Sequence, residues 1–174
     1  MWGSQWFSSA NVLERYKKLK LLSPAPQKPG NMWLLDYESN DRRSRTLILN
    51  QTTEGREHET VALVIMDAHS SLVRVIPCKN RGNVLQHILD TIALWGHTTK
   101  RIKADNAQEF VNEKKFKAWR QANGIALVEV QAYKHRMQAQ IENFIRHLKG
   151  MIRCINILKG IPDRFWPDLA KKYG

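Results

Sequence analysis

The sequence has few cysteines, no long apolar run and a shortage of acidic residues. Its two cysteines, Cys78 and Cys154, form no Cys-x-x-Cys pair and have no histidine pair beside them at zinc-ligand spacing, which argues against a disulfide framework and a structural zinc site. No apolar stretch approaches the length of a transmembrane helix, and residues 1–18 have no apolar core of a signal peptide. We therefore expect an intracellular chain without a membrane partner.

Because acidic residues are few, the protein is strongly basic. Lys and Arg number 28 against 16 Asp and Glu, which gives a formal net charge of +12 and an isoelectric point of about 10.0. Such an excess favours a polyanionic partner, and nucleic acid is the usual one. The 174 residues and a hydrophobic content of 43% predict one packed domain of ordinary size.

The chain divides into a short leading segment and a core. Residues 11–22 carry apolar side chains at helical spacing, and the proline-rich "SPAPQKPG" at 23–30 ends that pattern. We expect a helix and a linker over residues 1–30, ahead of a core over residues 31–174.

Within the core, strand-like and helix-like patterns alternate. A short apolar run at 31–37 precedes a polar stretch at 38–60 that we interpret as a long loop or a hairpin, and two β-branched runs at 61–78 predict a hairpin. The segments that follow predict a helix at 83–95, a strand at 100–105 and a helix at 112–124. They then predict a strand at 125–130 and a long helix from about Gln140. This order predicts an α/β fold, with a mixed sheet and helices on its faces.

Two aspartates come at the expected ends of strands. Asp36 ends the first predicted strand and Asp105 ends the fourth, so the two carboxylates would meet if these strands are parallel neighbours. Carboxylates that close repel unless a divalent cation lies between them. The alternative is that both are solvated strand-end acids. Asp67 also comes at an expected strand end, and we assign it to a hairpin turn.

The long helix supplies a third acid. Ile141, Ile145, Leu148, Ile152 and Ile155 form its predicted buried stripe. An adjoining stripe at the same spacing holds Glu142, Arg146, Lys149 and Arg153. One acid followed by three cations suits a metal beside a phosphate backbone, although Glu142 and Arg146 also have the spacing of an ordinary helix pair.

Three blocks of the core resemble the catalytic core of retroviral and retrotransposon integrases, the D,D,E family of polynucleotidyl transferases. "ADNAQEF" is similar to the family's D-N-G-x-E-F block, and the spacing from Asp105 to Glu142 is similar to that between the family's second acid and its glutamate. "VIMDAHSSLVRVIPCKNR" resembles the "IDDYSR" segment of copia-type elements. "IENFIRHLKGMIRCINILKGIPDRFWPDLA" resembles their E-R-x-N-R-T-L helix and the G-L-P-x-x-F-W block after it. The resemblance covers about residues 31–170 and favours the copia type.

The resemblance implies a fold, a reaction and a site. The fold would be ribonuclease-H-like, with a mixed five-stranded sheet flanked by helices. Asp36, Asp105 and Glu142 would be both the catalytic residues and the ligands of two Mg²⁺ or Mn²⁺ ions. The reaction would be processing of element DNA ends and their transfer into target DNA. A nuclear location and a homodimer or higher assembly are also implied.

We expect further residues to hold DNA beside this triad. The polar segment 131–140 is interpreted as a mobile loop over the site, in which His135 is given no catalytic role. The candidate DNA-binding residues are Arg146, Lys149, Arg153, Lys134 and Gln138.

The sequence also departs from the family's pattern. Ala107 stands where the family has glycine, Ala139-Gln140 stands where Gly-Val is usual, and Asn143 replaces a frequent arginine. The family's zinc-binding N-terminal module and basic C-terminal region have no counterpart here, as expected for a core fragment or a domesticated copy. Two alternatives therefore stay open. One is a catalytically decayed core that acts as a DNA-binding or interaction module, and the other is a ribonuclease-H-like nuclease, against which the "GIPDRFW" block argues.

Overall fold

The computed structural model describes residues 28–39, 55, 57–104, 113–128 and 135–174. Of the helix and linker predicted over residues 1–30, only residues 28–30 lie within these ranges, and most of the stretch after the first strand lies outside them. No helix in the described part of the chain is both long and apolar enough to cross a membrane.

The described residues form a five-stranded mixed sheet in the order β3-β2-β1-β4-β5. The strands are β1 (Trp33–Ser39), β2 (Val61–Asp67), β3 (Val73–Cys78), β4 (Arg101–Ala104) and β5 (Ala126–Val128). β1, β2 and β3 pair antiparallel, which confirms the predicted hairpin at 61–78, whereas β4 is parallel to both β1 and β5. All seven residues of β2 are buried, as its content of valine and isoleucine predicts.

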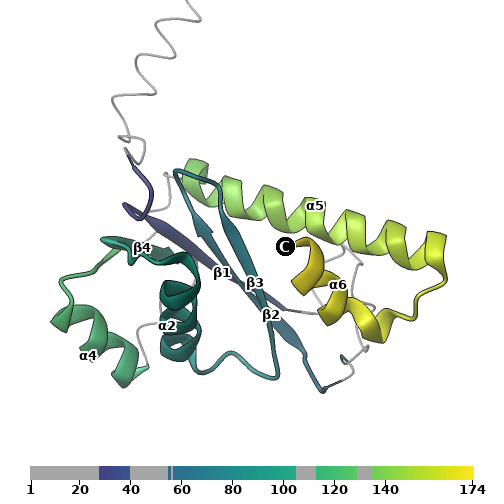
Figure 1. Ribbon diagram of the computed structural model, residues 1–174, viewed down its shortest axis with the longest axis horizontal. Coiled ribbons are helices and arrows are strands. Elements are labelled where there is room, and N and C mark those ends of the chain that lie inside the picture. Colours follow the sequence, from purple (N-terminus) through teal and green to yellow (C-terminus); the bar gives the residue numbers. More distant parts are fainter. Residues whose placement is uncertain (1–27, 40–54, 56, 105–112, 129–134) are drawn as a thin grey trace, which may run out of the picture.

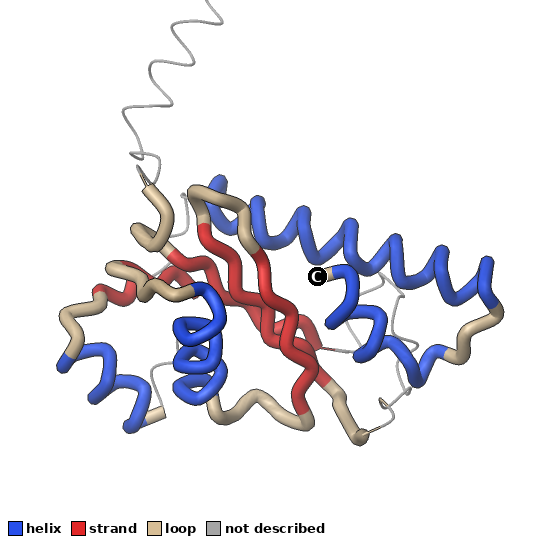
Figure 2. The backbone as a smooth tube through the Cα atoms, viewed as in Figure 1, coloured by secondary structure: helices blue, strands red, loops and turns tan. Residues whose placement is uncertain are grey.

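Helices cover both faces of this sheet. They are α2 (Val84–Trp95), α4 (Lys114–Ala122), α5 (His135–Lys159) and α6 (Trp166–Tyr173), with a short 3-10 turn at Asp163–Phe165. Figure 1 shows α5 and α6 on one face, and α2 and α4 on the other. Figure 2 shows the strands as a single layer between these helices. The α/β prediction is confirmed.

The side chains of β1 point alternately to the two faces of the sheet, and the core is therefore divided into two layers. Met32 and Leu34 pack with the buried stripe of α5 and with α6, whereas Trp33 and Leu35 pack with α2 and α4. This alternation is the ordinary pleat of a strand with both faces covered. It follows that residues 36 and 38, two and four positions after Leu34, share the α5 face of the sheet.

Candidate active site at the junction of β1, β4 and α5

The expected neighbourhood of the first and fourth strands is confirmed. β1 and β4 are parallel, and the last residues paired between them are Leu35 and Ala104. Asp36 follows Leu35, and Asp105 follows Ala104 along the chain. Asp105 itself lies outside the described residues. The register therefore brings two strands side by side at the positions immediately before the two aspartates.

The prediction that Asp36 ends its strand is wrong. β1 continues to Ser39, because residues 36–39 pair with Val61–Val64 of β2. Asp36 is half-buried within the strand and lies opposite Val64. Its place in the middle of a paired strand holds its backbone more firmly than a strand end would.

The prediction of a loop over residues 131–140 is also wrong for its second half. Residues 135–140 form the first turns of α5, so the helix begins before Gln140. The sequence "HRMQAQ" contains no glycine or proline and is rich in good helix formers, which explains the earlier start. Gln138 therefore belongs to α5, and Lys134 lies outside the described residues.

The predicted buried stripe of α5 is confirmed. Ile141, Ile145, Leu148 and Ile152 are buried, and Ile155 packs against them. The adjoining stripe, which we call the charged flank, consists of Glu142, Arg146, Lys149 and Arg153. Glu142, Arg146 and Arg153 are exposed, whereas Lys149 is half-buried.

Lys149 is tied to the sheet. Its ammonium forms an ion pair with the carboxylate of Glu38 on β1, with side-chain exposures of 14% and 25%. Its charge is thus partly neutralised, while Arg146 and Arg153 present theirs to solvent. The sequence argument missed Glu38 because it ended the first strand too early. The signal was its spacing of two residues from Asp36, which places both on one face of the strand.

This ion pair fixes the charged flank of α5 over β1. Glu142 lies seven residues before Lys149, or about 10 Å along the helix axis, on the same flank. Asp36 lies two residues before Glu38, or about 7 Å along the strand. In Figure 1, α5 and β1 both begin at the upper left of the view and run in the same general direction. Both acids therefore precede the ion pair along the same direction.

Buried Lys103 is a second residue that sequence reasoning missed. It is 4% exposed and lies beside Leu34 in the parallel register, which places it on the α5 face of β4. Nothing in the sequence around Lys103 indicates that its side chain is buried, and only the register of the sheet shows which face it lies on.

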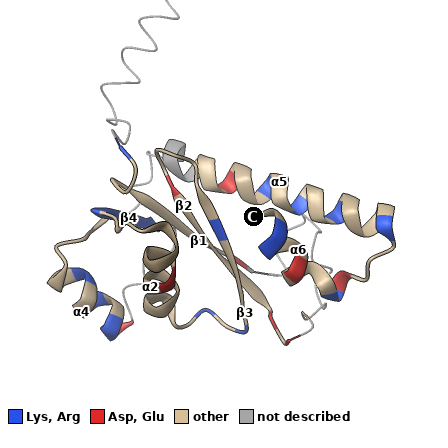
Figure 3. Cartoon of the chain, in the orientation of Figure 1, with Lys and Arg blue, Asp and Glu red and all other residues tan. Residues whose placement is uncertain are grey.

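Cations and acids are unevenly spread over α5. Figure 3 shows acidic colour early in the described part of the helix and basic colour after it. No group of three or more His, Cys, Asp or Glu side chains that could hold a metal occurs in the described ranges, from which Asp105 is missing. Among the predicted metal ligands the structure thus places Asp36 and Glu142.

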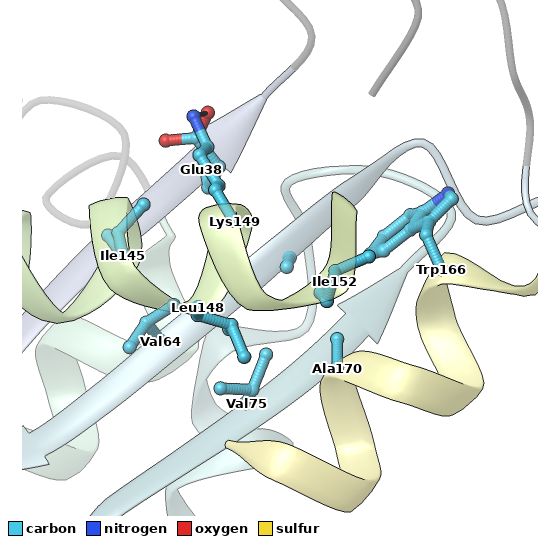
Figure 4. A pocket seen from close by; sticks show the side chains of 10 residues that line it. Glu38, Val64, Val75, Ile145, Leu148, Lys149, Ile152, Trp166 and Ala170 are labelled. Carbon is cyan, nitrogen blue, oxygen red and sulfur yellow. Dashed lines mark hydrogen bonds and ion pairs between the residues drawn. The ribbon is translucent and has the colours of Figure 1, made fainter. Parts of the chain in front are cut away.

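A small apolar cavity lies beneath the ion pair. Glu38 and Lys149 stand together at one side of the cavity (Figure 4). Its apolar lining includes Val64, Val75, Ile145, Leu148, Ile152 and Trp166. Its lining is almost wholly apolar, so it cannot hold a charged substrate.

The assignment of Asp67 to a structural turn agrees with its contacts. Its carboxylate is fully buried and accepts hydrogen bonds from the backbone N–H groups of Gly30 at 2.6 Å, His69 at 2.8 Å and Ser70 at 3.1 Å. Burial alone would raise the pKa of Asp67, but these three donors and the nearby His97 outweigh it and lower the pKa below its ordinary value. Asp67 holds residue 30 against the β2–β3 turn.

Comparison with known proteins gives structural matches alone. No protein-family model and no curated protein matches the chain. The magnesium complex of the HTLV-2 integrase catalytic core domain, in its dimeric form, aligns over 83% of this chain and 86% of its own with a TM-score of 0.57 and 16% identity.

Two further structures align over similar shares of the chain. The BIV integrase catalytic core domain aligns over 81% of this chain and 80% of its own, with a TM-score of 0.53 and 18% identity. The trimeric form of the HTLV-2 core aligns over 83% of this chain and 84% of its own, with a TM-score of 0.55 and 16% identity. The chain has the ribonuclease-H-like fold of retroviral integrase catalytic cores.

Proposed function

We propose that the chain is a metal-dependent polynucleotidyl transferase of the copia integrase type, which processes the ends of an element's DNA and joins them to target DNA. The observation that carries this proposal is the parallel register of β1 and β4. It pairs Leu35 with Ala104, the residues that precede Asp36 and Asp105 in the sequence, and the Lys149–Glu38 ion pair holds the charged flank of α5 over β1. The shared fold with integrase cores supports it.

The proposed metal ligands are Asp36, Asp105 and Glu142. Carboxylate oxygens are the donors that Mg²⁺ and Mn²⁺ prefer, and the similar HTLV-2 core is a magnesium complex. Asp36 is held within a paired strand, and Glu142 is exposed on a helix anchored by a buried stripe. Both described ligands thus stand on rigid elements, as a preorganised site requires. When bound, two such ions would activate the attacking water or 3′-hydroxyl and stabilise the leaving oxygen.

The protein's own part in the reaction is to hold DNA in line with the triad. Arg146 and Arg153 are exposed on the charged flank, one and three turns beyond Glu142, where they can reach phosphates beside the scissile bond. Lys149 can join them only by sharing or leaving its partner Glu38. Lys134 and Gln138 are proposed to contact DNA from the segment before Glu142.

We also propose that the chain works as a homodimer or higher assembly in the nucleus. The similar HTLV-2 cores are described in dimeric and trimeric forms. An assembly would let two DNA ends be processed together and joined to one target.

The test is a strand-transfer assay with a matched control. The purified chain, Glu142→Gln and Asp36→Asn are incubated with a labelled branched oligonucleotide that mimics the joined product, with Mn²⁺ or Mg²⁺. Asp90→Asn, on the opposite face of the sheet, controls for loss of a carboxylate. We expect metal-dependent cleavage and rejoining by the wild type and the control, and none by the two triad variants. If all four are inert but still bind DNA, the decayed DNA-binding module replaces the enzyme.

A further inference from the structure

The second sheet face carries a strongly basic helix that the proposed active site does not use. α4 has the sequence "KKFKAWRQA", with four basic residues and no acidic one. Figure 3 shows these basic residues along α4, with an acidic residue only at its beginning. Phe116 of α4 is buried with α2, on the face of the sheet away from α5. The basic charge of α4 thus lies across the sheet from Glu142 and Arg146.

The exposed side of α4 has a uniform chemistry. Lys114, Lys115 and Lys117 are exposed, and no ion pair to them comes from any residue that the structure describes. The small side chains of Ala118 and Ala122 on the same helix are also exposed. We call this surface the α4 lysine face. Small residues among lysines leave the helix open to close approach by a flat, charged partner.

The helix that carries this face is firmly anchored. Phe116 is 1% exposed and stacks on Trp119 with ring centroids 6.2 Å apart. The Arg120 guanidinium donates to the Ile125 carbonyl at 2.8 Å, and the Glu113 carboxylate accepts from the Val84 N–H at 3.1 Å. Both ends of α4 are therefore fixed, and the lysine ammonium groups start from a rigid base. Preorganisation of this kind lowers the entropic cost of binding.

The chemistry of the face selects its partner. Protein interfaces draw most of their binding energy from large apolar and aromatic anchors in a desolvated centre. The α4 lysine face offers no exposed aromatic or large aliphatic side chain, because Phe116 and Trp119 turn inward. Lysines are point charges well suited to phosphate, and a nucleic-acid backbone supplies phosphates at close, regular intervals.

We propose that the α4 lysine face binds the phosphate backbone of duplex DNA without regard to sequence, as a second DNA surface across the sheet from the proposed active site. Naming the polyanion as DNA rests on the proposed function. The two surfaces lie on opposite faces of the sheet, so the α4 lysine face holds a duplex segment other than the one at Glu142. Its contribution is to retain DNA while the other face acts.

The experiment measures the salt dependence of DNA binding. All proteins carry Glu142→Gln, so that no cleavage disturbs the reading, and affinity for a duplex of arbitrary sequence is measured by fluorescence anisotropy between about 50 and 200 mM salt. One variant has Lys114→Gln, Lys115→Gln and Lys117→Gln. The matched control has Lys79→Gln, Lys171→Gln and Lys172→Gln, which are also exposed and change the net charge by the same amount.

We expect the α4 variant to bind at least about tenfold more weakly at low salt, and its slope of log K against log salt to be smaller by about 2 to 3, since each lost phosphate contact removes about 0.9. The control should keep most of the affinity and slope of the Glu142→Gln parent. Equal losses in both variants would show that the charge acts diffusely and would overturn the proposal. An α4 variant that binds duplex DNA like the Glu142→Gln parent would overturn it too.

The DNA-binding experiment and the strand-transfer assay test separate claims, so either can fail without the other. If the strand-transfer assay fails but the α4 variant alone loses DNA affinity, the DNA surface stands without the enzyme. If strand transfer succeeds but the α4 variant binds normally, the enzyme stands without this surface. Thermal unfolding of each variant, expected to match the parent because all six lysines are exposed, verifies that the comparison is between folded proteins.

Discussion

Lys149 of α5 and Glu38 of β1 form an ion pair that joins the long helix to the central strand of the sheet. The pair is a polar contact between α5 and β1, and it stands beside an apolar cavity rather than in open solvent. Removal of one partner would leave a partly desolvated charge without its counterion. The pair therefore contributes to the position of the charged flank as well as to stability.

This relationship predicts a stability loss that reversal of both charges should repair. We expect Lys149→Ala to lower the free energy of unfolding by about 1 to 2 kcal/mol, since hydrogen bonds to charged groups contribute on that scale. Lys149→Glu should cost more, and Glu38→Lys combined with Lys149→Glu should recover part of the loss. Urea denaturation measures all of these. Arg153→Ala, an exposed change one turn on, should alter the free energy by less than about 0.5 kcal/mol.

The rotation of α5 about its axis can be tested through two isoleucines. Ile152 is 4% exposed beneath the helix, whereas Ile157 is 72% exposed. Ile152→Ala should lower the free energy of unfolding by about 2 to 4 kcal/mol because it removes buried apolar contacts and leaves a cavity. Ile157→Ala should change it by less than about 0.5 kcal/mol. Equal costs would mean that the helix is turned differently about its axis, and the charged flank, Glu142 included, would then face another direction.

Much of the fold follows from sequence periodicity. Strong local signals come from the β-branched runs of β2 and β3, from the end of α2 at Gly96 and from the buried stripe of α5. The extension of β1 through Glu38 could not be predicted, because pairing with β2 overrides the low strand preference of charged residues. The same holds for Lys103, whose burial depends on sheet register.

The candidate site was predictable only in part. The closeness of Leu35 and Ala104, which precede Asp36 and Asp105 in the sequence, depends on the strand order, which the sequence alone leaves open and which the parallel β1–β4 pair supplies. The engagement of Lys149 by Glu38 depends on two elements far apart in the sequence. The roles of Asp36, Asp105 and Glu142 in binding metal stay a prediction.

Asp67 should make the protein sensitive to acid. Its lowered pKa in the folded state means that its contribution is complete above the unfolded-state pKa of about 3.9, and is lost as the pH falls through the folded-state value. Asp67→Asn should therefore be less stable than the wild type at pH 7, by about 2 kcal/mol for the lost charge-assisted hydrogen bonds. This difference should shrink as the pH falls below about 4.

Urea denaturation at several pH values checks the Asp67 prediction. The exposed Asp90→Asn serves as the control and should track the wild type throughout. A stability difference between Asp67→Asn and the wild type that stays constant over this range would show that the carboxylate's charge is not what the three N–H groups stabilise.

The two cysteines should react at very different rates. Cys154 is exposed, whereas Cys78 is 8% exposed with its Sγ 3.4 Å from His87 Nε2. Burial raises the pKa of the Cys78 thiol, so its reactive thiolate is scarce near neutral pH. A chromogenic disulfide reagent should label one thiol rapidly in the native protein and the second only on unfolding. Cys154→Ser should abolish the rapid phase, and a rapid phase that persists would contradict the buried place of Cys78.

Binding of Mn²⁺ tests the proposed metal site most directly, because it requires neither a DNA substrate nor turnover. Electron paramagnetic resonance of free Mn²⁺ is recorded as the wild type, Asp36→Asn, Glu142→Gln and Asp90→Asn are titrated in. The wild type and Asp90→Asn should remove Mn²⁺ from solution with equal affinity, and each triad variant should weaken binding at least about tenfold, since each loses a charged oxygen ligand. Equal binding by all four proteins, or none by the wild type even with duplex DNA present, would contradict a metal site built from Asp36 and Glu142.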